Sequence, residues 1–265
     1  MRTRTLAVTA LSATAVTLTA CSSSSTPAAP TPASPTSAAL TVTGTVTVLA
    51  AASLQDSFTT LGKQFEAAHP GTQVKLSFGA SSALAQQINQ GAPADVFASA
   101  APTNMKQVTD AGGAAAPKNF VKNVMEIAVP PSNPAKVNGV SDLAKSNVKV
   151  ALCQPQVPCG AVAAQVFKNA QVTVKPVTLE QDVKSTLTKV QLNEADAGVV
   201  YTTDVLAAGT KVTGIPIPAD VNASTEYPIA ALSKAPNSAG AQAFVDYVLS
   251  PAGQTVLTAA GFEKP

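Results

Sequence analysis

The sequence predicts an α/β protein built from two lobes, each a mixed β-sheet covered by helices. The chain has 265 residues, 46% of them apolar, which is enough to bury a sizeable core. From residue 41 onward, short β-branched runs alternate with segments whose apolar residues recur at the helical period. Such alternation is typical of a largely parallel sheet with helices on its faces, and two lobes of roughly 100 residues each fit the length.

The first predicted elements alternate regularly between strand and helix. A strand at 45–51 precedes a helix whose apolar residues stand at 54, 58, 61 and 65, the spacing of one buried face. His69, the only histidine, stands beside Pro70 and is interpreted as the C-terminal cap of this helix. A strand at 73–78, a helix at 83–90 and a strand at 95–100 follow.

The rest of the chain repeats this pattern. Strands are predicted at 124–129, 149–152, 198–201 and 226–232, and helical faces at 162–167, 183–190 and 244–249. Ser250 and Pro251 are typical of a helix start and open the last helix. Because ligands of open α/β sheets bind at the carboxyl ends of strands, the strand-to-helix junctions are the candidate sites.

The charge pattern excludes several classes of protein. Only 12% of residues are charged and 4% are aromatic, which disfavours nucleic-acid binding. Both arginines, Arg2 and Arg4, lie at the N-terminus, and the 15 lysines balance 15 acidic residues. After removal of a leader the protein contains no guanidinium group, so any anion must be bound by other means.

The N-terminal segment is predicted to be an export signal. Residues 1–20 carry two arginines and an apolar stretch that is too short to span a bilayer. They end in Leu18-Thr19-Ala20-Cys21, which resembles a bacterial lipobox and implies lipidation of Cys21; the alternative is an ordinary signal peptide with an incidental cysteine. Residues 21–40 are rich in Ser, Pro, Thr and Ala and are interpreted as a disordered tether.

Two cysteines remain after lipidation. Cys153 and Cys159 stand six positions apart, and disulfides persist outside the cell, so we predict that they pair. Zinc binding is the alternative, but two cysteines without nearby histidines do not complete a tetrahedral site.

Serines and small residues mark three junctions. Ser53 follows the first predicted strand, and Ser81 and Ser82, which sequence alone does not separate, follow the second. Each serine is interpreted either as an ordinary N-cap or as a hydroxyl beside free amides that bind an oxyanion. Cys159 and Gly160 precede a third predicted helix. They are interpreted either as part of a loop held by the disulfide or as small residues that let a ligand approach the backbone closely.

Two further residues leave alternatives open. Thr178 and Asp182 compete as the N-cap before Val183, and only with Asp182 as the cap is the Val183 amide free. Tyr201 ends an apolar strand, and its hydroxyl either is satisfied in the core or faces a cleft.

A serine hydrolase is disfavoured, because His69 is the only imidazole and no Gly-x-Ser-x-Gly turn is present.

Four segments together resemble a known family. They are Ala50-Ala51-Ala52-Ser53-Leu54, the segments 77–88 and 91–100, and Gly198-Val199-Val200-Tyr201. They resemble the ModA family, the periplasmic molybdate-binding proteins of ABC importers, which are type II periplasmic binding proteins. The resemblance implies a two-lobed fold with two crossover strands as a hinge, residues 41–121 and 227–265 forming lobe I and residues 122–226 forming lobe II.

The resemblance also implies a ligand set. Ser53 and Ser81 would bind the oxyanion through hydroxyl and amide, Cys159 and Val183 through their amides, and Tyr201 through its phenol. The family usually has a small residue where this chain has Cys159. The resemblance favours Asp182 as the N-cap.

The function implied is that of a non-enzymatic lipoprotein on the outer face of the cell membrane. It would bind molybdate, and tungstate as well, as a monomer without a cofactor or a directly coordinated metal, and deliver the ion to an ABC permease with its cytoplasmic ATPase. Contact with the membrane would be through the lipid alone, with no nucleic acid as a partner. Alternatives are a receptor for another tetrahedral oxyanion such as sulfate, or a ligand sensor not coupled to transport.

Overall fold

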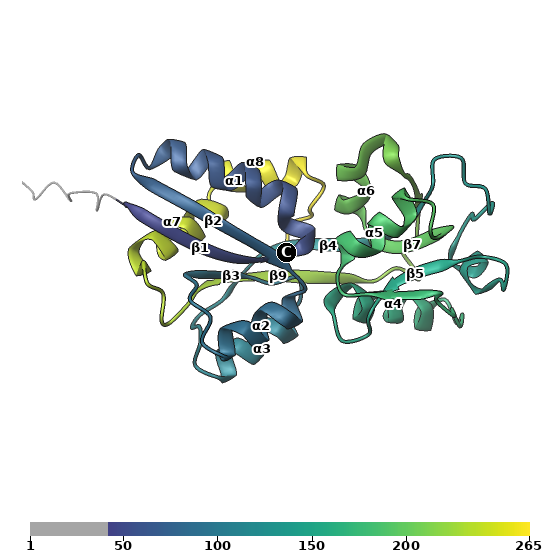
Figure 1. The fold of residues 1–265 in the computed structure, drawn as a ribbon, viewed down its shortest axis with the longest axis horizontal. Coiled ribbons are helices and arrows are strands. Elements are labelled where there is room, and N and C mark those ends of the chain that lie inside the picture. Colours follow the sequence, from purple (N-terminus) through teal and green to yellow (C-terminus); the bar gives the residue numbers. More distant parts are fainter. Residues whose placement is uncertain (1–41) are drawn as a thin grey trace, which may run out of the picture. The chain divides into compact units, whose positions relative to one another are not determined.

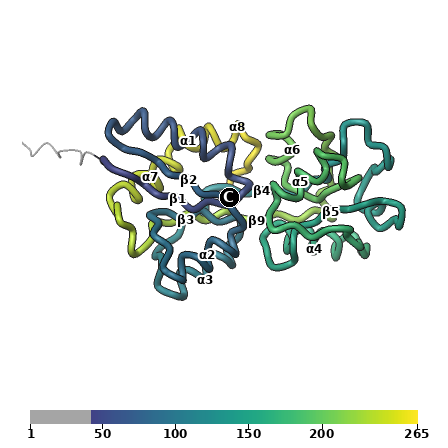
Figure 2. The backbone as a smooth tube through the Cα atoms, viewed as in Figure 1, coloured from purple at the N-terminus to yellow at the C-terminus, as the bar shows by residue number. Residues whose placement is uncertain are grey.

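The computed structural model describes residues 42–265, drawn as a ribbon in Figure 1 and as a backbone tube in Figure 2. The predicted signal peptide (1–20), the predicted lipidation at Cys21 and the predicted tether (21–40) lie outside these residues. Within 42–265 the chain forms two lobes of mixed sheet and helices, which confirms the predicted fold class. None of the helices in this range combines the length and apolar character that crossing a membrane requires.

The first lobe contains the N-terminal and C-terminal parts of the described chain. Its elements are β1 (Gly44–Ala51), α1 (Gln55–Ala68), β2 (Thr72–Gly79), α2 (Ser81–Asn89), β3 (Val96–Ala98), α3 (Pro102–Asp110), β9 (Ser224–Ala231), α7 (Ser238–Leu249) and α8 (Pro251–Ala259). β1 pairs in parallel with β2 and β3, whereas β3 pairs antiparallel with β9. The sheet is therefore mixed, as the predicted fold class requires, although its first strands are parallel.

Strand β1 is buried on both faces of this sheet. Val46 and Val48 pack with α1, α7 and α8, whereas Leu49 packs with α2 and α3 on the opposite face. This follows from the strand period of two. Figure 1 shows α1 and α8 on one side of the sheet and α2 and α3 on the other. Ala51, which ends β1, and Ala52, which follows it, are small and leave room at the carboxyl end of the strand.

The second lobe is an insertion between β3 and β9. Its elements are β5 (Val150–Cys153), α4 (Pro158–Asn169), β6 (Thr178–Glu180), α5 (Val183–Gln191), β7 (Ala197–Tyr201), α6 (Thr202–Ala208) and β8 (Thr213–Pro216). β5 pairs in parallel with β6 and β7, and α4 and α5 bury their apolar residues against this sheet. The carboxyl ends of β5 and β7 thus lead to the starts of helices, as in the first lobe.

Two extended segments connect the lobes. β4 (Lys118–Val129) pairs with β9 from Lys118 to Val124 and with β7 and β8 from Met125 to Val129. The chain returns through residues 222–223 into β9. The predicted strand at 124–129 covers only the second half of β4, because the first half, KNFVKN, is too polar to be read as a strand from its composition.

Candidate functional site

A small cavity lies where the carboxyl ends of strands from both lobes meet. Its lining is contributed by Ala51, Ala52, Ser53, Gly79, Ala80, Ser81 and Ala100 from the first lobe and by Val157, Pro158, Cys159, Asp182, Val183 and Tyr201 from the second. All five predicted ligand residues are therefore brought together. The space open to the centre of a water molecule is about 20 Å³, little more than one ordered water requires. The cavity suits one compact guest.

The two serines of the first lobe do not cap helices. Ser53 lies in a 3₁₀ turn (Ala52–Leu54) before α1, and Ser81 is the first residue of α2; neither side chain makes a capping hydrogen bond. The N-cap interpretation is wrong for both. α2 begins two residues before the predicted helix, and Ser81, which is 1% exposed, lines the cavity whereas the more exposed Ser82 does not.

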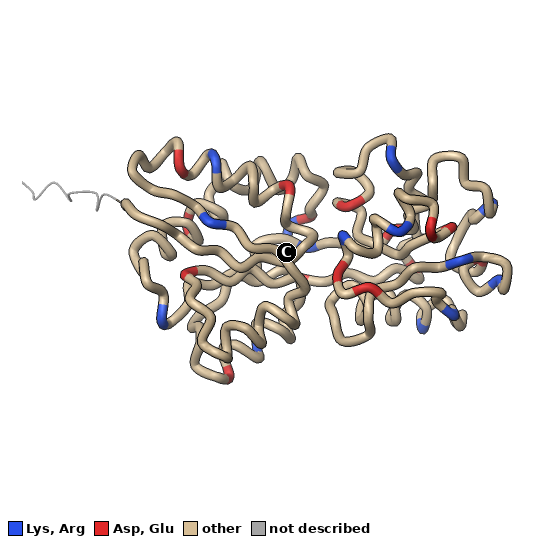
Figure 3. Tube along the Cα trace, viewed as in Figure 1, with Lys and Arg blue, Asp and Glu red and all other residues tan. Residues whose placement is uncertain are grey.

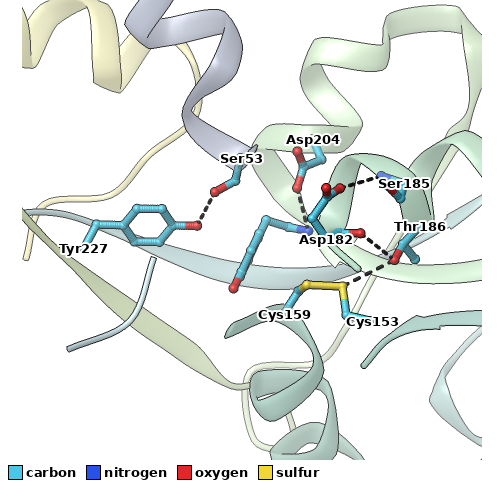
Figure 4. The surroundings of a disulfide bond; sticks show 9 residues. Ser53, Cys153, Cys159, Asp182, Ser185, Thr186, Asp204 and Tyr227 are labelled. Carbon is cyan, nitrogen blue, oxygen red and sulfur yellow. Dashed lines mark hydrogen bonds between the residues drawn. A yellow bond between two sulfur atoms is a disulfide. The ribbon is translucent and has the colours of Figure 1, made fainter. Parts of the chain in front are cut away.

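Each serine hydroxyl has a protein partner behind it. The Ser81 hydroxyl oxygen accepts a hydrogen bond from the Ala100 N–H at 2.9 Å. The Ser53 hydroxyl lies 2.9 Å from the hydroxyl of Tyr227, as Figure 4 shows. Because the Ala100 amide can only donate, the Ser81 hydroxyl proton is left to point elsewhere.

Two helices of the second lobe begin at the cavity. Cys159 follows Pro158 in the first turn of α4, so it belongs to the helix instead of preceding it, and Val183 is the first residue of α5. Amides at these positions have no acceptor within their own helix and carry the partial positive charge of the helix N-terminus. Both amides are available to an anion.

Asp182 is the N-cap of α5. Its carboxylate accepts a hydrogen bond from the Ser185 N–H at 2.8 Å, which Figure 4 shows. The Thr178 alternative is wrong, because Thr178 begins strand β6 and its hydroxyl donates to Glu180. The cap therefore starts α5 at Val183 and leaves the Val183 amide free, as the resemblance implied.

A disulfide joins the end of β5 to the start of α4. Cys153 and Cys159 are bonded, with their Cα atoms 5.8 Å apart, and both are buried (Figure 4). Gly160 packs so closely that a Cβ there would lie 2.0 Å from the Gln154 carbonyl oxygen. The disulfide and the glycine together hold the first turn of α4 against the strand that precedes it.

Tyr201 brings an unsatisfied hydroxyl to the cavity. The residue ends β7, its side chain is 1% exposed, and its hydroxyl has no hydrogen-bond partner among the described residues. The interpretation of Tyr201 as a core tyrosine with a satisfied hydroxyl is therefore wrong. Burial raises the pKa of this phenol well above its usual value, so it stays protonated and able to donate. An unpaired buried hydroxyl is costly, and a ligand oxygen would satisfy it.

Charged side chains stand beside the cavity but do not supply a cation to its lining. No lysine is among the lining residues, and Figure 3 shows charges spread over both lobes. Lys184 in α5 instead pairs with Asp56 of α1 at 2.9 Å, across the lobes, and with the buried Asp204 at 3.3 Å. Burial opposes the charge on Lys184, but these carboxylates outweigh it and raise its pKa.

The cavity therefore presents uncharged hydrogen-bond donors to a small guest. Hydroxyls and helix N-terminal amides converge from separate elements, which is the arrangement that binds an oxyanion without a cation. Across residues 42–265 there is no cluster of three His, Cys, Asp or Glu side chains that could hold a metal ion.

Sequence reasoning did not find two sets of residues near the cavity. The Lys184–Asp56 ion pair joins helices that are far apart in the sequence, and Tyr227 reaches Ser53 over a separation of 174 residues. Tyr227 does lie within the predicted strand at 226–232. The alternation of side chains along that strand, however, does not reveal which residue the Tyr227 hydroxyl contacts.

Two α/β lobes that meet over a small donor-lined cavity define a protein that binds a solute between its lobes. The chain belongs to the family of bacterial extracellular solute-binding proteins, whose family model matches residues 46–263. Members of this family bind solutes and are not defined by an enzymatic activity.

Several proteins similar to this chain are named for the anion that they bind. The chain is 42% identical over 221 residues to the molybdate-binding protein ModA of Mycobacterium tuberculosis H37Rv, covering 83% of this chain and 85% of that protein. The solved structure of the periplasmic molybdate-binding protein of Azotobacter vinelandii matches 83% of this chain and 99% of that one, with a TM-score of 0.73 and 22% identity. The solved structure of the sulfate-binding protein SubI of M. tuberculosis matches 83% of this chain and 86% of that one, with a TM-score of 0.74 and 19% identity. These two structural likenesses show the fold alone.

Proposed function

We propose that this protein binds molybdate, and tungstate as well, between its two lobes and delivers the ion to an ABC permease. The observation that carries the proposal is the donor-lined cavity, in which the buried Tyr201 hydroxyl has no hydrogen-bond partner among residues 42–265 and is free to donate to a ligand. The relative in M. tuberculosis, named a molybdate-binding protein, supports the choice of ion. The ligand residues are Ser53, Ser81, Cys159, Val183 and Tyr201.

The donors favour a fully deprotonated tetrahedral dianion. A hydrogen bond to a charged acceptor contributes about 1.5–3 kcal/mol, and several of them converge here. A protonated anion would bring an O–H group to a ring of donors, where the carboxylate among the lining residues, Asp182, is already engaged as the N-cap of α5. Sulfate also lacks a proton, so discrimination between molybdate and sulfate depends on the size of the closed cavity.

Delivery to the permease follows from the anchoring that we propose. Lipid at Cys21 would hold the protein at the outer face of the membrane, and the tether at 21–40 would let the folded part reach the permease. The protein acts as a monomer, contacts the membrane through the lipid alone and requires no cofactor.

Calorimetric titration of the purified protein with molybdate, tungstate, sulfate and phosphate tests this function. We expect micromolar or tighter binding of molybdate and tungstate, about −8 kcal/mol or more favourable, and much weaker binding of sulfate and phosphate. Tight sulfate binding without molybdate binding would instead identify a sulfate receptor. Absence of binding to all four anions would contradict the proposal.

Anchoring is tested separately in cells. The full chain, expressed in a bacterium that processes lipoproteins, should partition with the membrane fraction and take up labelled fatty acid. A Cys21→Ser variant should do neither. Equal labelling of the two chains would exclude lipidation at Cys21.

A further inference from the structure

The Ser53 hydroxyl is backed by a buried hydrogen-bond network in the two strands that connect the lobes. Tyr227, in the crossover strand β9, is fully buried and lies 2.9 Å from the Ser53 hydroxyl oxygen, but it does not line the cavity. Asn123, in the other crossover strand β4, is 1% exposed and lies behind Tyr227. The Tyr227 ring also packs against Tyr201, but its hydroxyl reaches the cavity through the Ser53 hydroxyl.

The direction of these hydrogen bonds follows from Asn123. Its side-chain oxygen accepts from the Val124 N–H at 3.1 Å, which fixes the orientation of the amide. The NH₂ group then donates to the Thr203 hydroxyl at 2.8 Å and, over a longer 3.5 Å, to the Tyr227 hydroxyl oxygen. An amide NH₂ group cannot accept, so Tyr227 accepts from Asn123 and has its own proton free.

Among the described residues, the acceptor within hydrogen-bond distance of this free Tyr227 proton is the Ser53 oxygen, 2.9 Å away. Once Ser53 accepts from Tyr227, its own hydroxyl proton is released toward the cavity. Ser81 reaches the same state by a different route, because its oxygen accepts from the Ala100 N–H. Both serines therefore present a proton, and not a lone pair, to a guest.

We propose that Tyr227 and Asn123 are positioning residues that orient the Ser53 hydroxyl as a donor and thereby make the site selective for oxyanions that carry no proton. This inference rests on the proposed function. Without Tyr227 the Ser53 hydroxyl can rotate and turn a lone pair toward the cavity, where it would accept a hydrogen bond from a protonated anion. Sulfate and hydrogen phosphate are the matched probes, since they are tetrahedral dianions that differ by one proton.

The first experiment compares Tyr227→Phe with a control, Tyr247→Phe, which removes a hydroxyl from α7 that bonds only to the side chain of Gln64. Competition of each anion against molybdate at pH 8 gives the relative affinities. In Tyr227→Phe we expect about tenfold weaker molybdate binding, and a preference for sulfate over hydrogen phosphate that is at least about threefold smaller than in the wild type. Tyr247→Phe should match the wild type in both. An unchanged sulfate-to-phosphate ratio in Tyr227→Phe would overturn the proposal.

The second experiment is a double-mutant cycle with Ser53→Ala. If Tyr227 acts through Ser53, the Tyr227→Phe change should leave molybdate affinity unaltered in the Ser53→Ala background. An equal loss in both backgrounds would overturn the proposal. Asn123→Asp, which replaces the donor with an acceptor and draws the Tyr227 proton away from Ser53, should shift the ratio in the same direction even if Tyr227→Phe folds poorly.

The outcomes separate this inference from the proposed function. If the wild type binds no oxyanion, the proposed function fails. If the wild type binds molybdate and Ser53→Ala weakens it, while Tyr227→Phe changes neither affinity nor the anion ratio, the function stands and only the positioning role is excluded.

Discussion

At the scale of single residues, the hydroxyl of Tyr201 is the most informative group. It is buried in the wall of the cavity and has no partner in the described chain, although buried hydroxyls are usually hydrogen-bonded. Its ring packs edge-on against Tyr227, with centroids 6.1 Å apart, which holds the hydroxyl oxygen in place. This is the geometry of a preorganised ligand donor.

Replacing Tyr201 by phenylalanine should remove one donor to the anion and leave the fold intact. We expect molybdate binding to weaken by roughly 1–3 kcal/mol, while the free energy of unfolding of the ligand-free protein stays the same or rises, because an unsatisfied buried hydroxyl is removed. Calorimetry and urea denaturation of the same preparation measure both. Unchanged affinity would remove Tyr201 from the ligand set.

Asp204 is a second residue whose properties can be tested, because its pKa is shifted by burial. Its carboxylate is fully buried behind the cavity, accepts from the Tyr201 N–H at 3.2 Å and faces Lys184. Burial raises its pKa from 3.8 to about 6, although the Lys184 charge works in the opposite direction. The folded protein therefore binds a proton at Asp204 more tightly than the unfolded chain does.

The sign of the resulting pH dependence follows from this difference. Below about pH 3.8 both states are protonated at Asp204, and as the pH rises to about 6 the folded state loses roughly 3 kcal/mol of stability from this group. Asp204→Asn should remove that loss, so the variant should gain stability over the wild type as pH rises from 4 to 7. Urea unfolding across this range measures it, with the exposed Asp246→Asn as control. Parallel curves for Asp204→Asn and wild type would exclude the effect.

At the scale of elements, the junctions of strands with helices determine what the cavity offers. β1, β2, β5 and β6 lead to helices that begin there, and small residues, a cap or a disulfide set where each following helix begins. The start of α4 differs from the other junctions, because a disulfide and the closely packed Gly160 hold it against β5.

The disulfide should stabilise the protein modestly. A loop closed over six positions gives about 2 kcal/mol in the chain-entropy model. Replacing both Cys153 and Cys159 by serine should lower the free energy of unfolding by about this amount and weaken molybdate binding by displacing the Cys159 amide. Adding reductant to the wild type should reproduce the loss, whereas the serine variant should not respond to reductant. Identical stability of oxidised and reduced wild type would contradict this account.

Much of this element-level structure is predictable from sequence, for reasons visible in particular segments. The Leu54 to Phe65 spacing predicted α1, because a single apolar face imposes the helical period, and His69 is its C-terminal cap as predicted. The first half of β4 was missed, because it is a strand through its pairing with β9 and has no apolar run of its own. Ser81 could not be separated from Ser82 by pattern, since only the start of α2 decides which side chain faces the cavity.

The candidate site was predictable to a smaller extent, and mainly through resemblance. Junction chemistry indicated an anion site, but it did not reveal that the Ser53 hydroxyl bonds to Tyr227 or that Tyr201 lacks a partner. Those facts depend on contacts between segments distant in sequence, which no local pattern encodes. Composition did show that residues 42–265 contain no arginine, because Arg2 and Arg4 precede them in the sequence.

At the scale of the whole molecule, one ion pair joins the lobes beside the cavity. Lys184 of the second lobe and Asp56 of the first lie 2.9 Å apart, next to the Val183 amide in sequence. The pair forms only when the lobes are close together, so it contributes to closure. Because Asp56 is largely exposed, the contribution is about 1 kcal/mol or less and is screened by salt.

Removing the Asp56 charge should therefore weaken molybdate binding slightly, by a fewfold at low ionic strength, and the difference should vanish at high salt. Asp110→Asn is the matched control, since Asp110 pairs with Lys106 within one helix and its loss changes the net charge equally. Calorimetry of Asp56→Asn and Asp110→Asn at two salt concentrations measures the effect. Equal behaviour of the two variants would assign no role in closure to the interlobe pair.

The central claim is that uncharged donors from both lobes, and no cation, surround the bound ion. A crystal structure of the molybdate complex tests it most directly. We expect each molybdate oxygen to contact only hydroxyls and backbone amides, drawn from Ser53, Ser81, Cys159, Val183 and Tyr201. A Lys184 ammonium within hydrogen-bond distance of a molybdate oxygen would contradict the account.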